Sequence, residues 1–321
     1  VDRVAAWALL SRMYLNAKVY TGTERYQDCV TYSEKVINSG YTLHTNYAHL
    51  FLADNDTNGA QKENIFTLNY DGLRSQTWGG TTFLVHASIG GSMKVEDFGL
   101  KGGAWEGLRT TKSLVNKFNG SGTPPTSWTD ARAMFHTNGQ TYEIEDVSKF
   151  EQGYAVTKFK NITSKGQAGK DPAGQIVDTD LPLIRLAEML LIYAEAHTQN
   201  VGYDGLVITE LNKLRVRAGM PDVPTALSKN DALDFIRKER RIELAGEGLR
   251  YFDIRLYEDN QRNGGFKGTQ AASVVMTGQI KDVVGNKGVT KTWSERLMYL
   301  PIPQTALDKN KNTGMKQNPG Y

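Results

Sequence analysis

The sequence predicts a mainly α-helical protein in which pairs of helices alternate with long loop-rich insertions and a small amount of β-strand. Two stretches, residues 1–40 and 181–218, each contain two segments whose apolar residues recur at helical spacing, separated by a short turn. The remaining stretches are rich in Gly, Asn and Thr. The 321 residues include 32 glycines but 9 prolines, which is typical of long, ordered surface loops.

The whole chain, residues 1–321, is expected to form a single domain with four consecutive regions. These are a helix pair at 1–40, a loop-rich region at 41–180, a second helix pair followed by a strongly charged helix at 181–257, and a loop-rich tail at 258–321. A chain of this length can bury one sizeable core or two small ones.

In the first pair, residues 4–17 and 24–38 are predicted to form helices joined by a turn at 20–23. A helix pair of about 34 residues resembles a tetratricopeptide unit. The apolar faces expected to pack inward comprise Leu9, Leu10, Met13 and Tyr14 on the first helix and Tyr26, Cys29, Val30, Val36 and Ile37 on the second.

In the second pair, residues 183–198 and 204–218 are predicted to form helices, and Gly219 followed by Pro221 ends the second one. The apolar faces comprise Ile184, Met189, Leu191 and Ile192, then Val207, Leu211 and Leu214. Two such pairs are too few for a free-standing solenoid, which usually needs about three or more repeats.

Short regular elements are expected within the loop-rich regions. Residues 64–70 and 154–160 alternate like β-strands, residues 110–118 have the pattern of a short helix, and residues 296–302 look extended. Strands are therefore a minor part of the predicted fold.

The helix that begins near Asn230 ends in an unusual cluster of charges, comprising Arg237, Lys238, Glu239, Arg240, Arg241 and Glu243. Because Ile242 is the only apolar residue among them, no amphipathic stripe can bury this turn, and we expect several of the charges to pair across the fold. Gly246 and Gly248 end the helix, since glycine adopts a left-handed cap conformation without steric cost. An apolar anchor follows, formed by Leu249, Tyr251, Phe252 and Ile254.

This order of a charged helix, a Gly-Glu-Gly break at 246–248 and a Leu-Arg-Tyr-Phe-Asp run at 249–253 resembles the signature of the SusD/RagB family. The Tyr-Leu-Pro-Ile-Pro-Gln segment at 299–304 and the asparagine-rich ending at 310–321 are also typical of that family. The resemblance covers essentially the whole chain and implies a SusD-like fold. We expect the signature itself to be structural, without touching a ligand.

Members of this family are surface glycan-binding lipoproteins of Bacteroidetes that work with a SusC-like TonB-dependent porin. The resemblance therefore implies an outer-membrane, surface-exposed location and a role in nutrient uptake. Family members carry a signal peptide, a lipid-anchored cysteine and a helical N-terminal portion, and Val1 begins well inside a helix pattern. We therefore expect this chain to be the C-terminal portion of a longer protein, attached to the membrane through an N-terminal lipid anchor that this chain lacks.

The bulk composition argues against several other partners. Lys and Arg number 38 and Asp and Glu 35, with no basic block, which argues against nucleic acid. No apolar run approaches the roughly 18 to 20 residues needed to cross a bilayer. The single cysteine, Cys29, rules out an internal disulfide and is expected to be a small buried apolar residue.

Two tryptophans flanked by glycines are the strongest candidates for ligand contact. Trp78 and Trp105 have few neighbouring side chains to bury them, so each indole is expected to present a face to solvent. A flat aromatic ring can cover the C–H face of a sugar while nearby polar groups bind its hydroxyls. The candidate hydroxyl ligands are Asp71, Arg74, Gln76 and Glu106. The alternative is that both tryptophans are core residues whose glycines merely turn the chain.

The resemblance favours sugar contact. In the starch-binding member of the family, an aromatic residue before a Gly-Gly-Ser/Thr run and a later tryptophan form part of an arc that matches an α-glucan. Trp78 precedes such a run at 79–83, and Trp105 follows after a comparable interval. The first position is Trp here and Tyr in the starch binder, so a starch-like α-glucan is the first expectation, with xylan, arabinan, host glycans and β-glucans as alternatives.

Aspartates at two places predict a structural Ca²⁺ ion. The segment that begins with Asp54 and Asp56 matches the opening of an EF-hand calcium loop. The match fails at its end, because Ile65 occupies the position where an EF-hand has its bidentate Glu. Asp178 and Asp180 offer further carboxylates, and the starch-binding relative holds Ca²⁺ between comparable segments. The alternative is a solvated polar loop with a helix cap at Asp180.

Signals for catalysis are weak, and we predict that the protein is not an enzyme. The five histidines, His44, His49, His86, His136 and His197, show no metal-binding spacing and are expected to be surface or hydrogen-bonded core residues. No nucleophile elbow, phosphate-binding loop or dinucleotide motif is present. The prediction is non-catalytic glycan binding. A helical protein-interaction module with both tryptophans in its core is the alternative, and a glycoside hydrolase is a weaker one.

Overall fold

The computed structural model describes residues 2–146, 148–249, 253, 304–309 and 316. The chain divides into two compact units, Val1–Gly248 and Leu249–Tyr321, and the expectation of one domain stays a prediction. In the second unit the structure describes helix α12 (Gln304–Lys309). The predicted anchor residues Tyr251, Phe252 and Ile254, the extended segment 296–302 and the asparagine-rich ending, apart from residue 316, lie outside the described residues.

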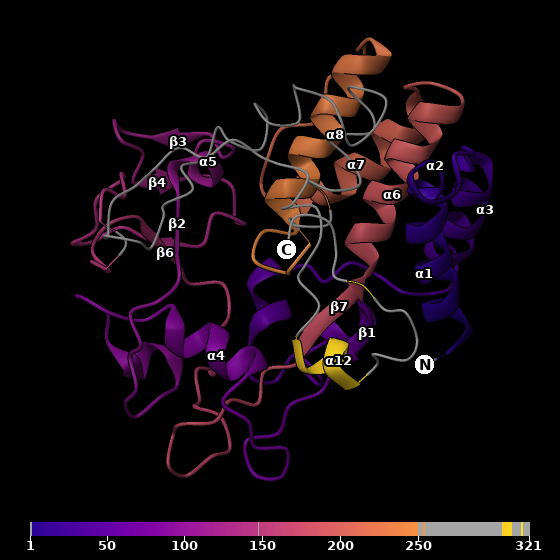
Figure 1. Ribbon diagram of the computed structural model, residues 1–321. Helices are drawn as coiled ribbons and strands as arrows, with labels where there is room; N and C mark the ends of the chain where they lie inside the picture. The colour runs from indigo at the N-terminus through magenta and orange to yellow at the C-terminus, as the bar shows by residue number, and fades with distance from the viewer. Residues whose placement is uncertain (1, 147, 250–252, 254–303, 310–315, 317–321) are drawn as a thin grey trace. The chain divides into compact units, whose positions relative to one another are not determined.

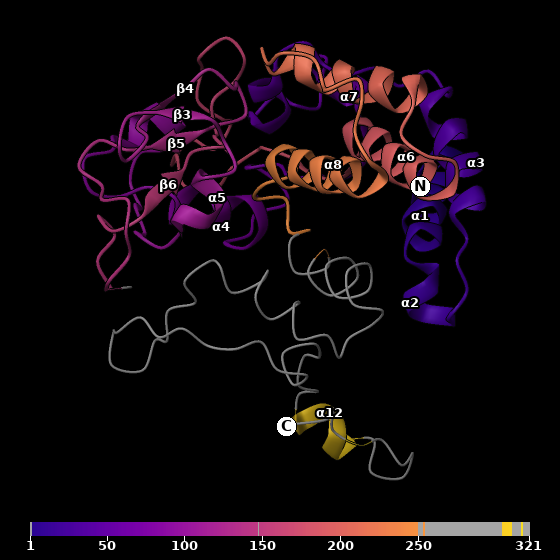
Figure 2. The same cartoon turned by 90° about the horizontal axis from the view of Figure 1, so that it is seen from above.

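The first unit is mainly helical, as predicted (Figure 1). Helix α6 (Leu186–Asn200) is its centre, because α1, α3, α7 and α8 all contact it, and the two views show these helices side by side (Figures 1 and 2). Residues 186–198 are all buried, so the polar side chains of this helix also lie in the interior, where arginines contact the carboxylates of Glu188 and Glu195. The other helices are α1 (Arg3–Leu15), α2 (Ala17–Thr21), α3 (Tyr26–Ile37), α4 (Gly80–Ala87), α5 (Lys112–Val115), α7 (Gly205–Arg217) and α8 (Lys229–Glu243), with short 3-10 helices at Tyr47–Phe51, Ala60–Lys62 and Val95–Phe98.

Local signals in the sequence explain where several helices begin and end. The side chains of Asp2, Asp204 and Ser228 accept hydrogen bonds from backbone N–H groups in the first turns of α1, α7 and α8. Gly219 adopts a φ of 70° just after α7, and Gly246 a φ of 76° just after α8, as predicted. These glycines let the chain leave each helix in a conformation that other residues adopt at a steric cost.

The face of α1 that packs inward differs from the predicted one. Leu9 and Met13 are each 52% exposed, whereas Ala5, Ala8 and Leu15 are buried against α3 and α6. The prediction was wrong for Leu9 and Met13. It holds for Tyr14, which packs against this core beside Leu15 and the small residues Ala5 and Ala8. The predicted faces of the other helices are confirmed, since the following residues are buried: Cys29, Val30, Val36, Met189, Leu191, Ile192, Val207, Leu211 and Leu214.

The strands are short, and the longest two form an antiparallel ribbon. Strand β1 (Asn64–Leu68) confirms the predicted strand at 64–70, and it pairs with β7 (Leu181–Arg185). Helix α6 therefore begins at Leu186 and not at residue 183, because the ladder with β1 holds residues 181–185 in an extended conformation. This ribbon joins the loop-rich region to the central helix.

Two small sheets lie within the loop-rich region. Strand β6 (Tyr154–Val156) pairs with β2 (Arg109–Thr110) and with β5 (Phe135–His136), and β3 (Gly120–Ser121) pairs with β4 (Ser127–Trp128). The strand predicted at 154–160 is thus shorter than expected, since it ends where pairing with β5 ends. The helix predicted at 110–118 is a single turn, α5, because its first residue, Thr110, belongs to β2.

The charges of α8 pair across the fold, as predicted. Glu243 is completely buried and contacts three guanidinium groups, with Arg185 at 2.7 Å, Arg132 at 3.3 Å and Arg217 as the third. Burial alone would raise the pKa of Glu243, but the charges of Arg217, Arg185 and Arg132 hold it well below its ordinary value. The carboxylate is therefore ionised inside the core.

This network extends through the Gly-Glu-Gly break. Glu247 accepts hydrogen bonds from Arg185 at 2.8 Å and from Lys158 at 2.7 Å, and Glu63 next to β1 pairs with Arg185 and Arg217. Burial lowers the pKa of Lys158 to about 8. The described part of the signature therefore ties α8 to β1, β7 and α7 and has a structural role. Among the described helices, none combines the length and the apolar character needed to cross a membrane.

Candidate functional site

The structure brings the two glycine-flanked tryptophans together on the surface. Trp78 is 55% exposed and Trp105 39% exposed, and their ring centroids lie 5.9 Å apart with planes inclined by 41°. Phe83, 44% exposed, lies with its ring centroid 6.1 Å from that of Trp105. The prediction that both indoles present a face to solvent is confirmed, and the alternative that they are core residues is wrong. We call Trp78, Phe83 and Trp105 the aromatic platform.

Helix α4 positions both sides of this platform. Trp78 lies two residues before the first residue of the helix, Gly80, which has a φ of 58° and at which an added Cβ would lie 1.8 Å from the hydroxyl of Tyr70. Only glycine fits this turn. Phe83 projects from the exposed side of α4, while Val85 on its inner side is buried in a core with the short helix at 47–51 and with Val177. The platform therefore rests on a helix anchored in the protein interior.

The segment that carries Trp105 lies along the last turn of α4. The N–H of Trp105 donates to the carbonyl of His86 at 3.0 Å, and the N–H of Glu106 donates to Ile89 at 3.0 Å. Glu106 has a φ of 54°, a left-handed conformation that costs a residue other than glycine on the order of 1 to 3 kcal/mol. The backbone hydrogen bonds hold this strained residue beside the platform.

His86 lies beneath the platform, and the sequence prediction did not assign it to the site. It is 1% exposed, and its ring stacks on the indole of Trp105 with centroids 4.7 Å apart and planes inclined by 20°. Phe83 was also absent from the predicted ligand contacts. A signal for both was present in the sequence, because positions 83 and 86 share one face of the helix that follows Trp78.

The predicted hydroxyl ligands of the Trp78 loop have defined places. Asp71 accepts hydrogen bonds from the N–H groups of Leu73 at 2.8 Å and Arg74 at 3.1 Å, which lower the pKa of Asp71 below its ordinary value. The amide nitrogen of Gln76 donates to the carbonyl of Gly72 at 2.8 Å. Asp71 and Gln76 thus shape the loop that presents Trp78, and the side chain of Arg74 is exposed on it. A ligand contact by these three residues stays a prediction.

The four aspartates predicted to bind calcium act as acceptors for neighbouring segments. Asp178 accepts from the N–H of Gly72 at 2.9 Å, and Asp180 accepts from the N–H of Tyr70 at 2.7 Å, so both hold the start of the Trp78 loop. Burial raises the pKa of Asp180 to about 6. Asp54 accepts from the N–H and hydroxyl of Ser164, and Asp56 from the hydroxyl of Thr57.

These carboxylates do not by themselves make a cation site. Within the described ranges, no group of three or more His, Cys, Asp or Glu side chains is arranged to hold a metal ion. A calcium ion needs about six to eight oxygen ligands, so further backbone or side-chain oxygens would have to join these carboxylates. Calcium binding at Asp54, Asp56, Asp178 and Asp180 stays a prediction, which a comparison of melting temperatures in CaCl₂ and in EDTA would test.

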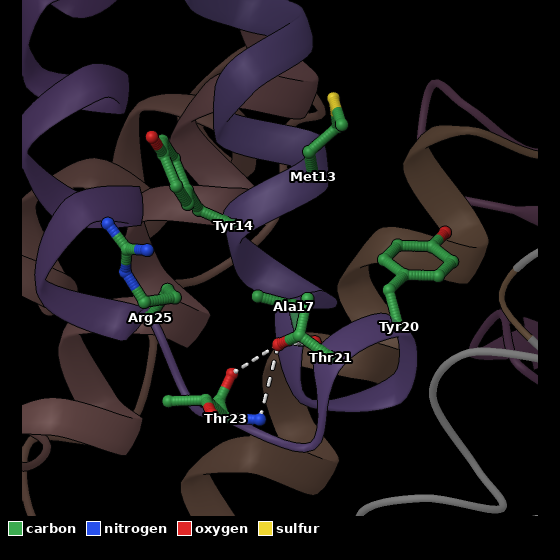
Figure 3. Close-up of a pocket in the computed structure, with 7 residues that line it drawn as sticks. All are labelled: Met13, Tyr14, Ala17, Tyr20, Thr21, Thr23 and Arg25. Carbon is green, nitrogen blue, oxygen red and sulfur yellow. Dashed lines mark hydrogen bonds between the residues drawn. The ribbon is translucent and has the colours of Figure 1, made fainter.

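A cavity of about 410 Å³ opens between α1, α2 and the turn that follows them (Figure 3). Met13 and Tyr20 stand at its edges, and its polar groups are engaged locally. The hydroxyl of Thr21 accepts from the N–H of Thr23 at 3.2 Å, and the guanidinium of Arg25 pairs with Asp28 at 2.6 Å. This cavity is therefore mainly an apolar surface, whereas the platform has exposed polar side chains beside its rings. The seven lining residues are Met13, Tyr14, Ala17, Tyr20, Thr21, Thr23 and Arg25.

Comparison with known proteins agrees with the fold and identifies the family. The model of the SusD family matches residues 136–321, which is more than half of the chain. The chain belongs to the SusD family. The starch-binding protein SusD of Bacteroides thetaiotaomicron is 29% identical, with a match that covers 100% of this chain and 60% of that protein. The chain thus spans about 60% of the length of this relative.

Solved structures share the fold at lower sequence identity. A SusD superfamily protein from Parabacteroides distasonis is 22% identical with a TM-score of 0.69, and the match covers 100% of this chain and 63% of that one. A laminarin-binding SusD-like protein is 23% identical with a TM-score of 0.65, with the same coverage of 100% and 63%. The predicted SusD-like, mainly helical fold is confirmed.

Proposed function

We propose that this chain is the glycan-binding portion of a non-catalytic, cell-surface protein, and that the aromatic platform is its binding surface. The observation that carries the proposal is the cluster of three exposed rings, Trp78, Phe83 and Trp105, on a turn and a helix that are anchored in the core. Exposed aromatic rings in such a cluster can stack on the apolar C–H faces of sugar rings.

The proposed ligand is an oligosaccharide or polysaccharide, with a starch-like α-glucan as the first candidate. The 29% identity to a starch-binding protein supports this choice. The inclined planes of Trp78 and Trp105 also support it, because a pair of rings at 41° suits a curved chain better than a flat ribbon. Laminarin, a glycan that one structural neighbour is named for, is the alternative to test beside it.

The proposed context is the outer membrane of a bacterium. The complete protein would be a surface-exposed lipoprotein held by an N-terminal lipid anchor, and it would pass the bound glycan to a SusC-like TonB-dependent porin. Membership of the SusD family supports this proposal. Asp71, Arg74 and Gln76 would bind sugar hydroxyls at the edge of the platform. Exposed polar contacts exchange with water, so each would add little affinity and mainly select the shape of the glycan.

Affinity electrophoresis tests this function. The protein and its Trp78→Ala, Phe83→Ala and Trp105→Ala variants are run in gels that contain amylopectin, laminarin, xylan or arabinan, with melting temperatures measured in parallel. We expect retardation of the wild type in amylopectin and a loss of at least about tenfold in affinity for each tryptophan variant. Because the rings are exposed, the variants should melt close to the wild type.

Two controls make the result specific. Tyr20→Ala removes an aromatic ring that is 61% exposed on α2, so it should leave retardation unchanged. Trp128→Ala removes a ring packed against Phe135 and Tyr154, so it should lower the melting temperature. Absence of retardation in every gel would overturn the proposal, and release of reducing sugar on long incubation would instead indicate a hydrolase.

A further inference from the structure

Backbone hydrogen bonds fix the segment that carries Trp105 to the C-terminal end of helix α4. The N–H of Trp105 donates to the carbonyl of His86 at 3.0 Å, and the N–H of Glu106 donates to that of Ile89 at 3.0 Å. The next two N–H groups along the chain both donate to the carbonyl of Ala87. The last carbonyls of a helix have no partner within the helix, so this segment provides donors for those of His86 and Ala87.

The residue that follows Trp105 is strained in this arrangement. Glu106 has a left-handed φ of 54°, and among the residues that the structure describes it is the only one other than glycine with a positive φ. A residue with a Cβ adopts this conformation at an energetic cost. Such strain persists only where the surrounding contacts hold it, and it is concentrated at functional positions. The contacts that hold Glu106 therefore bear on the role of the neighbouring indole.

The side chain of Glu106 makes two of those contacts. Its Oε1 accepts a hydrogen bond from the N–H of Gly91 at 3.3 Å. Its Cγ lies against Gly90, where an added Cβ would be 2.6 Å from this atom and 2.7 Å from the ring of Phe150. The N–H of Met93 donates to the carbonyl of Gly90 at 3.0 Å and closes the turn that Glu106 contacts. The absence of a side chain at Gly90 thus makes room for the stem of Glu106.

We propose that Glu106 is a positioning residue for the indole of Trp105. The carboxylate and the stem hold residue 106 in its left-handed conformation, and this conformation lets successive N–H groups reach different carbonyls at the end of α4. The strain lowers the free energy of unfolding, while the fixed backbone keeps the indole beside Trp78 and Phe83. The sequence predicts Glu106 as a hydroxyl ligand, whereas in the proposed role it acts through Trp105. The effect on glycan affinity rests on the proposed function, and the orientation of the indole does not.

Substitution by Ala and by Gly tests the strain. Both changes remove the carboxylate and its stem, but only Gly relieves the left-handed conformation. We therefore expect Glu106→Gly to melt at a higher temperature than Glu106→Ala.

Glu96 is the matched control for this pair of substitutions. It is an exposed glutamate in the 3-10 helix Val95–Phe98, and its φ is not positive. At this position Gly relieves no strain and has more conformational freedom to lose on folding than Ala. Glu96→Gly should therefore melt at a lower temperature than Glu96→Ala, which is the opposite order from residue 106.

Fluorescence of Trp105 in the absence of glycan tests the positioning. Each variant is compared with the same variant carrying Trp105→Phe, so that the difference in emission and in acrylamide quenching reports on this one indole. Glu106→Ala and Glu106→Gly should both change the difference. Glu106→Gln should retain most of the wild-type signal, because its amide oxygen can accept from the N–H of Gly91 and its stem has the same length. The two Glu96 variants should leave the signal unchanged.

Amylopectin gels then measure the consequence for binding. Glu106→Ala and Glu106→Gly should each bind about two- to tenfold more weakly than the wild type, which is the range expected for the loss of one hydrogen bond. Glu106→Gln should recover most of the affinity. A merely structural role would make affinity follow the melting temperature, whereas positioning makes Glu106→Gly lose affinity even though it is the more stable of the two truncated variants.

Three outcomes would overturn the proposal. The first is a melting temperature of Glu106→Ala equal to or above that of Glu106→Gly, which would show that residue 106 is not strained. The second is a wild-type Trp105 signal in both truncated variants. The third is a loss of affinity without a change in that signal, which would indicate direct contact between Glu106 and the glycan. If the wild type is not retarded in any gel, the proposed glycan function fails, and the melting and fluorescence measurements still decide whether Glu106 positions Trp105.

Discussion

Glu243 and Arg185 form a fully buried ion pair at 2.7 Å, although 58 residues separate them in sequence. Arg185 ends β7 immediately before the central helix α6, and Glu243 ends α8. Because Glu243 also contacts Arg132 and Arg217, one carboxylate compensates charges from three different parts of the chain. The helix packing around α6 therefore depends on a charge that is removed from water.

Replacement of Glu243 by Gln should destabilise the protein strongly. The amide leaves three buried guanidinium groups short of a negative charge, which costs about 3–5 kcal/mol in the free energy of unfolding. Urea denaturation followed by circular dichroism measures the change. The matched control is Glu210→Gln, in a surface pair with Lys213, which should cost less than about 1 kcal/mol. Equal effects of the two variants would contradict the structural role assigned to α8.

Substitution of Gly103 should disturb the platform while its neighbour tolerates the same change. In Gly103→Ala the new Cβ meets His86, and the left-handed conformation costs a further 1–2 kcal/mol or so. We expect altered near-ultraviolet circular dichroism from the tryptophans and weaker retardation by amylopectin. An added Cβ at Gly102 meets nothing within 4 Å, so Gly102→Ala should leave both signals unchanged. A normal spectrum for Gly103→Ala would refute the close approach.

The pH dependence of stability should reveal the buried carboxyl of Asp180. Burial raises the pKa of Asp180 to about 6, so folding favours the protonated carboxyl. The resulting contribution to the free energy of unfolding is fully present below the ordinary pKa of an aspartate and is lost as pH rises through about 6. Asp180→Asn imitates the protonated form. The melting temperature of Asp180→Asn minus that of the wild type should therefore increase as pH rises from about 4.5 to about 7.5.

Differential scanning fluorimetry across that range measures the Asp180 effect. The control is Asp28→Asn, since the hydrogen bond from Arg25 lowers the pKa of Asp28. That variant should show no relative gain as pH rises. A constant difference between Asp180→Asn and the wild type at all pH values would show that Asp180 is not perturbed in the folded protein.

The orientation of α1 predicts unequal costs for its apolar residues. Leu15 is 4% exposed and Leu9 is 52% exposed, so Leu15→Ala should cost about 2–5 kcal/mol and Leu9→Ala about 0.5 kcal/mol or less. The two substitutions remove the same atoms from the same helix. Thermal unfolding measures the loss of stability in both variants. A larger loss for Leu9→Ala would indicate that the face of α1 predicted from the sequence is the one that packs inward.

Much of the fold follows from patterns that are local in the sequence. Helical spacing of apolar residues predicts α3, α6 and α7, and the glycines at 219 and 246 mark the ends of α7 and α8 because these positions need a positive φ. Alternation predicts β1. Each of these signals arises within a few residues, so no knowledge of distant contacts is needed to recognise it.

Local patterns fail where a distant partner decides the structure. Leu183 and Ile184 fit the apolar pattern of α6, yet they are extended because β1 pairs with β7. The inward face of α1 depends on how closely α3 and α6 approach, and small residues such as Ala8 permit the closer packing. Helical periodicity alone cannot distinguish these outcomes.

For the candidate site, the sequence by itself predicted that Trp78 and Trp105 would present a face to solvent, because the flanking glycines leave them few neighbours to bury them. It left a place in the core as the alternative, and the structure decided between the two. The sequence also determined that the charges of α8 would need partners, because no apolar stripe could cover that turn. Only the tertiary structure decided which partners those charges have, and that Phe83 joins the platform while His86 lies beneath it. These relationships depend on the distances in space between segments that are far apart in the chain. The spacing of residues along the sequence does not determine those distances.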